Sequence, residues 1–337
     1  MSDTGINTFF KRNKRPQESP KEIAEKLLAG DRSALSRAIT FVESNKKSHQ
    51  KVAAEILKIC LPHSGKSLRI GITGVPGVGK STFIEAFGCK VVKDYNKKVA
   101  VLAVDPSSQK SKGSILGDKT RMEELVTLED AFVRPSPAGA TLGGVAQKTR
   151  EAIFLCEAAG YEIILIETVG VGQSETAVKS MVDYFLLLML AGAGDELQGI
   201  KRGIMEMADT IVITKADSGN ENNAIKAKVS YQNAVHLFPP HESNWTTKVL
   251  SSSSLEGRGL DRIWEEVVKY EDHVTSNGFI EANREEQSLN WFHESVKSEL
   301  IGKFYDRPEV MQKIVDLEKA IKEKRISSFA AARALLE

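Results

Sequence analysis

The chain has 337 residues, with 27% charged and 41% hydrophobic side chains, a composition typical of a soluble globular protein with room for one large domain or two modest ones. Its net charge of +1 lacks the basic excess of nucleic-acid-binding proteins, and its longest apolar run, residues 184–192, is too short to cross a membrane, so we expect neither kind of partner. The cysteines Cys60, Cys89 and Cys156 are too far apart for a disulfide framework or a CxxC metal site, which favours a reducing compartment and a cytoplasmic location.

Residues 1–62 form the first of three zones, and we expect a helical N-terminal extension there. Apolar side chains recur at helical spacing, and Asp31 stands where a helix N-cap is expected. The apolar positions are Leu27, Leu28, Leu35, Ile39, Val42, Val52, Ile56 and Ile59.

Residues 63–274 form the second zone, in which short apolar segments alternate with helical ones. The segments expected to be strands are residues 68–73, 99–104, 131–133, 163–167, 184–190, 210–214 and 248–250. This alternation predicts an α/β domain with a mostly parallel sheet covered by helices. Ligands of such domains gather at the carboxyl ends of the strands, so functional residues are expected there.

A phosphate-binding loop of the pattern GxxxxGK[ST] follows the first predicted strand. It consists of Gly74, Val75, Pro76, Gly77, Val78, Gly79, Lys80, Ser81 and Thr82. Glycines let the backbone wrap phosphates, and the next helix presents its N-terminal amides to them. We predict that Lys80 contacts the β- and γ-phosphates of a nucleotide and that the Ser81 hydroxyl binds Mg²⁺. The alternative is an ordinary glycine-rich turn; the flanking strand and helix favour a P-loop NTPase.

Asp105 directly follows the second predicted strand and is followed by Pro106. A carboxylate at this edge of the sheet is placed to support Mg²⁺ behind its direct ligands. The alternative is a plain Asp-Pro turn.

The fourth predicted strand ends in Glu167-Thr168-Val169-Gly170, where P-loop GTPases place DxxG. We predict that Glu167 holds Mg²⁺ or its water and that the Gly170 amide meets the γ-phosphate. Val171 stands where small GTPases place the glutamine that orients water, so unassisted hydrolysis is expected to be slow. Gln173 and Glu175 are candidates for completing the site; otherwise they only shape the loop.

Thr214-Lys215-Ala216-Asp217 follows the sixth predicted strand and matches the [NT]KxD pattern that reads guanine. A carboxylate accepts from guanine N1 and N2 together, whereas adenine offers no such donor pair. Thr214 replaces the commoner asparagine, so the bracing of this loop is expected to differ. Ser253-Ser254-Leu255 follows the last predicted strand and is a weaker candidate for the loop beside guanine O6.

Residues 275–337 form the third zone, in which the strands stop. Two amphipathic helices separated at residues 306–308 and a short last helix are expected. They form either an interaction or dimerisation arm or a helical cap on the same domain.

Taken together, the motifs resemble the MeaB/ArgK/MMAA family of P-loop GTPases. They are GVPGVGKST, VDPSS, RPSP…TLGG, ETVGVGQSE, GDELQGIKRGIMEMAD and TKAD, in this order, and the resemblance covers about residues 20–337. It implies a GTP-hydrolysing chaperone that gates adenosylcobalamin delivery to, and protects, an acyl-CoA mutase such as methylmalonyl-CoA mutase. It also implies GTP/GDP and Mg²⁺ as ligands, a homodimer formed through the C-terminal arm, and a switch loop at residues 194–203 that couples nucleotide state to the mutase.

Two other functions remain open at this point. One is a metallocentre-insertion GTPase of the nickel type, although the six histidines are scattered and no CxxC is present. The other is a kinase or ATPase linked to amino-acid transport, against which Asp217 argues because it favours guanine over adenine.

Overall fold

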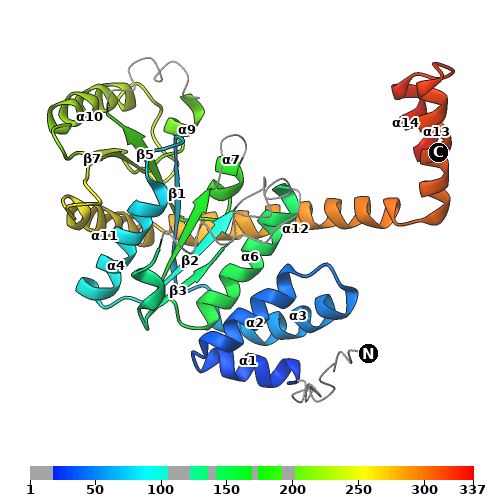
Figure 1. Cartoon of the computed structure of the whole chain (residues 1–337), viewed down its shortest axis with the longest axis horizontal. Helices are drawn as coiled ribbons and strands as arrows, with labels where there is room; N and C mark the ends of the chain where they lie inside the picture. The colour runs from blue at the N-terminus through cyan, green and yellow to red at the C-terminus, as the bar shows by residue number, and fades with distance from the viewer. Residues whose placement is uncertain (1–17, 105–121, 136–141, 169–173, 192–201) are drawn as a thin grey trace, which may run out of the picture. The chain divides into compact units, whose positions relative to one another are not determined.

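The computed structural model describes residues 18–104, 122–135, 142–168, 174–191 and 202–337 (Figure 1). The chain divides into two compact units, residues 1–273 and residues 274–337. The first contains the whole sheet, and the second is helical.

Seven strands form one sheet in the order β3-β2-β4-β1-β5-β6-β7, and every neighbouring pair is parallel. Each predicted strand is present, so the α/β fold with a parallel sheet is confirmed. The strands are β1 (Leu68–Gly74), β2 (Val99–Val104), β3 (Ala131–Arg134), β4 (Ile163–Thr168), β5 (Tyr184–Leu190), β6 (Thr210–Thr214) and β7 (Lys248–Ser251). β1 lies between β4 and β5, and Ile72 pairs in register with Glu167, which places Glu167 beside the phosphate-binding loop.

Helices cover both faces of this sheet, which explains why β1 and β4 are buried along their whole length. Figure 1 shows α4 and α11 on one face and α6 on the other. The ring centroids of Phe87 on α4 and Trp264 on α11 are 6.2 Å apart, so these helices pack together. The helical elements that connect and follow the strands are α4 (Lys80–Tyr95), η2 (Leu125–Thr127), α6 (Leu142–Ala158), α7 (Ser174–Lys179), α9 (Arg202–Glu206), α10 (Glu221–Val235) and α11 (Leu260–Ser276).

The N-terminal zone folds into α1 (Pro20–Leu28), α2 (Arg32–Glu43) and α3 (Lys47–Cys60), followed by η1 (Leu61–His63). Asp31 is the N-cap of α2, as predicted, and accepts from the backbone amides of Ser33 and Ala34 at 2.7 and 2.9 Å. At the other end of α2, Glu43 accepts from Arg134 Nε at 3.0 Å, which ties the three helices to the end of β3.

The second unit contains α12 (Phe279–Tyr305), α13 (Pro308–Lys322) and α14 (Ser328–Leu336). The break between α12 and α13 falls at Asp306 and Arg307, where Pro308 starts the next helix. Large apolar side chains on this unit are exposed, among them Phe292 and Leu300. Within the described ranges, no helix combines the length with the apolar character that crossing a membrane would need. The three cysteines are buried free thiols.

Candidate nucleotide site

The predicted phosphate-binding loop connects β1 to α4, as the sequence pattern requires. Gly79 caps the start of α4 with φ of 90°, a conformation that other residues rarely adopt. A Cβ at Gly74 would stand 2.5 Å from the carbonyl oxygen of Leu188 on β5. The loop thus needs glycine for its curvature at one end and for its close approach to β5 at the other. It delivers the free amides of the first turn of α4 to one point, which suits an anion.

Lys80 lies in the first turn of α4 and folds back over the loop. Its Nζ donates to the carbonyl oxygen of Gly74 at 2.9 Å. Burial lowers the pKa of Lys80, and the nearby carboxylates of Glu167 and Glu175 oppose this shift. A partly desolvated ammonium held over a glycine loop is suited to pair with a phosphate.

Ser81 and Glu167 converge although 86 residues separate them. The Ser81 hydroxyl donates to Glu167 Oε1 at 3.3 Å, and Glu167 is almost fully buried at the end of β4. Next to them the Thr168 hydroxyl donates to the Thr73 hydroxyl at 2.9 Å, joining the ends of β4 and β1. A hydroxyl and a carboxylate at one point form an all-oxygen donor set, which fits a hard cation such as Mg²⁺.

The loop after β6 is hydrogen-bonded directly to the phosphate-binding loop. The Thr214 hydroxyl is buried and donates to the carbonyl oxygen of Val78 at 2.9 Å. Lys215 has a positive φ of 54°, and its Nζ donates to the carbonyl oxygen of Gly77 at 2.8 Å. The bracing expected to change with threonine at position 214 is therefore made by a single hydroxyl group.

Asp217 and Ser253 meet at the carboxyl ends of β6 and β7. The Ser253 hydroxyl donates to Asp217 Oδ2 and accepts from the backbone amide of Glu256 at 3.1 Å. Asp217 is only 7% exposed and Ser253 is fully buried. Of the other two residues predicted here, Ser254 is half-buried and Leu255 is 78% exposed. The carboxylate is thus fixed in position by a neighbouring loop.

Three predicted site residues, Asp105, Gly170 and Gln173, lie outside the described residues, as does most of the predicted switch loop at residues 194–203. The structure therefore describes the phosphate-binding loop, the Ser81–Glu167 pair and the loop that is predicted to read the base. It brings these three parts to the same edge of the sheet, at the carboxyl ends of the strands.

Asn220 and Arg258 hold the Asp217 loop but carry no motif that could single them out in the sequence. Asn220 Nδ2 donates to the carbonyl oxygen of Lys215 at 3.0 Å, and Arg258 Nη2 donates to that of Ala216 at 3.2 Å. Arg258 follows β7 closely in a turn that contains Gly257 and Gly259. That turn is the one local signal that could have drawn attention to it.

Comparison with known proteins gives a consistent result along nearly the whole chain. The model of the MeaB family, described as methylmalonyl-CoA mutase-associated GTPase, matches residues 35–309. A Caulobacter vibrioides protein described as a putative GTPase is 51% identical over 93% of this chain and 96% of its own length. GTPase ArgK of Escherichia coli is 43% identical, covering 94% and 95%, and a mouse protein named methylmalonic aciduria type A homolog is 42% identical, covering 92% and 77%.

Among solved structures, that of an LAO/AO transport system kinase matches with a TM-score of 0.74 at 37% identity, covering 94% of this chain and 96% of the other. This likeness in fold extends over nearly the full chain, as do the sequence matches to the relatives above. Because the family model covers most of the chain and the relatives align along nearly all of it, this chain belongs to the MeaB family of methylmalonyl-CoA mutase-associated GTPases and is itself a GTPase.

Proposed function

We propose that the chain is a GTP-binding and GTP-hydrolysing chaperone that gates adenosylcobalamin delivery to, and protects, an acyl-CoA mutase such as methylmalonyl-CoA mutase. The observation that carries the proposal is membership of a family described as mutase-associated GTPases, together with a braced carboxylate at the base-reading position. The coupling to cobalamin rests on the motif resemblance alone.

In this proposal the guanine nucleotide lies across the carboxyl ends of β1, β6 and β7. Residues 74–82 wrap the phosphates, Lys80 Nζ exchanges its bond to Gly74 for one to a phosphate, and Asp217 accepts from the base. Support comes from the direct hydrogen bonds of Thr214 and Lys215 to the phosphate-binding loop. Because the loop after β6 is hydrogen-bonded to the phosphate-binding loop, the position of the Asp217 loop depends on that of the loop around the phosphates.

Hydrolysis in this site depends on placing charge and water. Mg²⁺, held by Ser81 with Glu167 and supported by Asp105, would neutralise the charge that develops on the phosphate oxygens. Lys80 adds a second positive charge; burial lowers the pKa of Lys80, and the nearby Glu167 and Glu175 carboxylates oppose that shift. Val171 has no polar atom in its side chain, so in this proposal Gln173, Glu175 or a group from the partner orients the attacking water. The expected consequence is slow hydrolysis by the isolated protein.

The test of this function compares GTP turnover by the purified protein with and without methylmalonyl-CoA mutase. We expect faster turnover in the presence of the mutase, and loss of that stimulation when Lys80 is replaced by methionine. Equal turnover with and without the mutase would remove the basis for the proposed coupling.

We further propose that residues 275–337 serve as a homodimerisation arm, with residues 1–62 as an extension of the GTPase domain at residues 63–274. Exposed apolar side chains on α12, such as Leu289, Phe292 and Leu300, support the first part. Ending the chain after residue 275 should give a monomer on a sizing column. A dimer of that shortened chain would contradict the assignment.

The two alternatives are separated from this proposal by binding measurements. A transport-linked ATPase or kinase, the kind of protein for which the matched solved structure is named, would bind ADP more tightly than GDP. A nickel-insertion GTPase would bind nickel stoichiometrically. Among the described residues, the side chains that lie close enough together to hold a metal ion are Glu85, Cys89 and Glu124. Because this group contains no histidine, it gives the nickel alternative no specific support.

A further inference from the structure

A cavity of about 570 Å³ lies beside β7, the edge strand of the sheet, away from the proposed guanine site. Its walls come from the second half of α10, the segment 238–247, the first residues of β7, and α11. The proposed guanine site is at the carboxyl ends of the strands, whereas this cavity is lined by Lys248, Val249 and Leu250 of β7 and by the second half of α10, and its lining includes neither Asp217 nor Ser253. The volume is within the range of about 300–1,000 Å³ that is usual for small-molecule sites.

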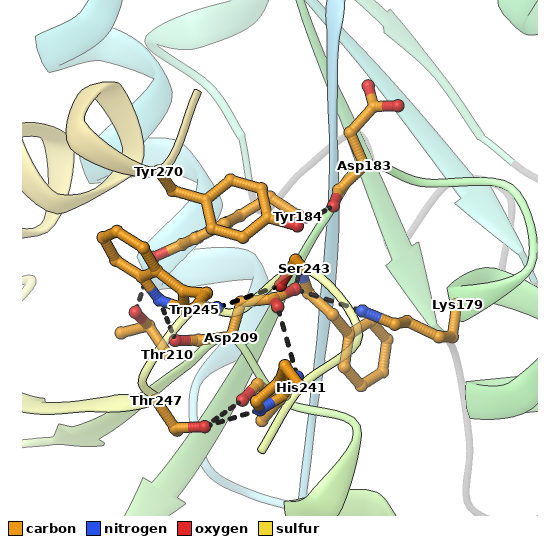
Figure 2. A network of polar contacts seen from close by, with 12 residues as sticks. Lys179, Asp183, Tyr184, Asp209, Thr210, His241, Ser243, Trp245, Thr247 and Tyr270 are labelled. Atoms are coloured by element: carbon orange, nitrogen blue, oxygen red, sulfur yellow. Dashed lines mark hydrogen bonds and ion pairs between the residues drawn. The ribbon is translucent and has the colours of Figure 1, made fainter. Parts of the chain in front are cut away.

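The wall formed by residues 238–247 is fixed by a network of polar contacts around Asp209 (Figure 2). Trp245 Nε1 donates to the backbone carbonyl oxygen of Asp209 at 3.1 Å, and the Thr247 hydroxyl donates to that of Ala208 at 2.9 Å. His241 Nε2 is 2.8 Å from the same hydroxyl. The buried Asp209 carboxylate accepts from Lys179 Nζ at 3.1 Å and from the Phe185 amide at 2.8 Å. The cavity wall is thus anchored to the sheet, so the cavity does not depend on a loop closing over a ligand.

Three cationic side chains line the cavity: Lys228, Lys248 and Arg262. In the part of the chain that the structure describes, none of them forms an ion pair, whereas Lys179 and Lys269 nearby are both paired. Lys248 Nζ lies 5.5 Å from the centre of the Trp245 ring, which holds the ammonium at the cavity without neutralising it. Unpaired cations that converge on one concave surface attract an anion.

A further feature narrows the kind of anion. Trp245 and Phe238 contribute aromatic rings to the cavity lining, which suit a flat apolar group. An anion that also carries a flat ring therefore fits this lining better than a bare inorganic ion does.

We propose that this cavity is a second ligand site, for an organic phosphate that carries a flat ring, as a nucleotide does. The phosphates pair with Lys228, Lys248 and Arg262, and the ring lies against Trp245. The same chemistry is offered by a free nucleotide and by the nucleotide end of a larger cofactor such as coenzyme A.

The test is a calorimetric titration with ADP of the full chain, loaded with Mg²⁺ and one equivalent of GDP so that the guanine site is saturated without excess GDP to occupy the second site. We expect one further ADP bound per chain. The double variant Lys228→Gln/Lys248→Gln should bind ADP at least about a hundredfold more weakly, because each of the two removed hydrogen bonds to a charged group is worth about a factor of ten or more. Lys226→Gln is the matched control, since Lys226 is an exposed lysine on the same helix that does not line the cavity.

Absence of ADP binding to the GDP-saturated protein at millimolar concentration, or equal affinity in the double variant and the control, would overturn the proposal. Inorganic pyrophosphate carries the charge of the diphosphate group without a ring, so it measures the contribution of charge alone. It should bind more weakly than ADP, and equal affinity would refute the role of the aromatic residues. Coenzyme A separates the two sources, because tighter binding of coenzyme A than of ADP would assign the site to the larger cofactor. GDP affinity is recorded in the same preparations, so failure here is distinguishable from failure of the guanine site.

Discussion

Replacing Asp217 by asparagine tests the base-reading loop most sharply, because the surrounding hydrogen bonds fix how the new side chain must sit. Ser253 Oγ accepts from the Glu256 amide, so its own proton is directed at position 217. In the Asp217→Asn variant that proton selects the amide oxygen, and the amide NH₂ is left facing the base. Guanine presents N1–H and N2–H at this point, so a donor would face two donors.

The magnitude follows from the two hydrogen bonds that are lost. Hydrogen bonds to a charged group contribute about 1.5–3 kcal/mol each, so losing both costs about 3–6 kcal/mol. At about 1.4 kcal/mol for each factor of ten, GDP affinity should fall by about 10²- to 10⁴-fold. Xanthine carries a carbonyl oxygen where guanine carries its amino group, so xanthosine diphosphate should bind the variant more tightly than GDP does.

The assay is calorimetric titration of GDP, xanthosine diphosphate and ADP into the wild type and the variant with Mg²⁺ present. Asp272→Asn is the matched control, because it makes the same chemical change at an exposed position on α11 and should leave GDP affinity unchanged. An Asp217→Asn protein that binds GDP within about threefold of the wild type would refute the assignment of Asp217 to the base. So would a variant that still prefers GDP to xanthosine diphosphate.

Variants at three other positions test two further parts of the nucleotide site and the histidine in the wall of the cavity beside β7. Lys80→Met should abolish GTP hydrolysis and weaken GTP binding by at least about tenfold, because it removes the ammonium group that we propose pairs with a phosphate; a turnover assay that shows unchanged hydrolysis would contradict this. Thr214→Val should lower the free energy of unfolding in urea by about 1–3 kcal/mol by leaving the buried Val78 carbonyl oxygen without its donor, and Thr214→Ser should restore it; equal stability of the two variants would show that the hydroxyl does not brace the loop. Burial lowers the pKa of His241 below its ordinary value of 6.5, so the unfolded chain binds the proton more readily and the free energy of unfolding falls as the pH drops below about 6.5. His241→Gln should therefore lose less stability than the wild type between about pH 7.5 and about pH 5.5, and an identical loss would show that this group does not titrate as argued.

The strands were predictable because helices cover both faces of the sheet. A strand buried on both faces reads as an unbroken apolar run, and residues 184–190 are such a run with every position but the last buried. Local chemistry was equally informative at Asp31, which caps α2, and at Pro308, which starts α13. The P-loop and TKAD motifs were readable for the same reason, since each is a short segment whose geometry depends mainly on its own residues.

The contacts between these segments could not be predicted from the sequence. The Thr168–Thr73 hydrogen bond depends on β4 and β1 being neighbours, and the Thr214–Val78 hydrogen bond joins residues 136 positions apart. Both follow from the strand order, which no local pattern records. The cavity beside β7 depends in the same way on residues from α10, a long connecting segment and α11 meeting at one edge of the sheet.

In the proposed function, the nucleotide bound in this site controls association with an acyl-CoA mutase. The affinity of the protein for methylmalonyl-CoA mutase is measured with a non-hydrolysable GTP analogue and then with GDP, each at a concentration that saturates the wild type but not the Asp217→Asn variant. We predict affinities that differ by at least about tenfold between the two nucleotides, with the difference abolished for guanine nucleotides in Asp217→Asn but regained with xanthosine nucleotides. Equal mutase affinity in the two nucleotide states, or no binding in either, would contradict the account.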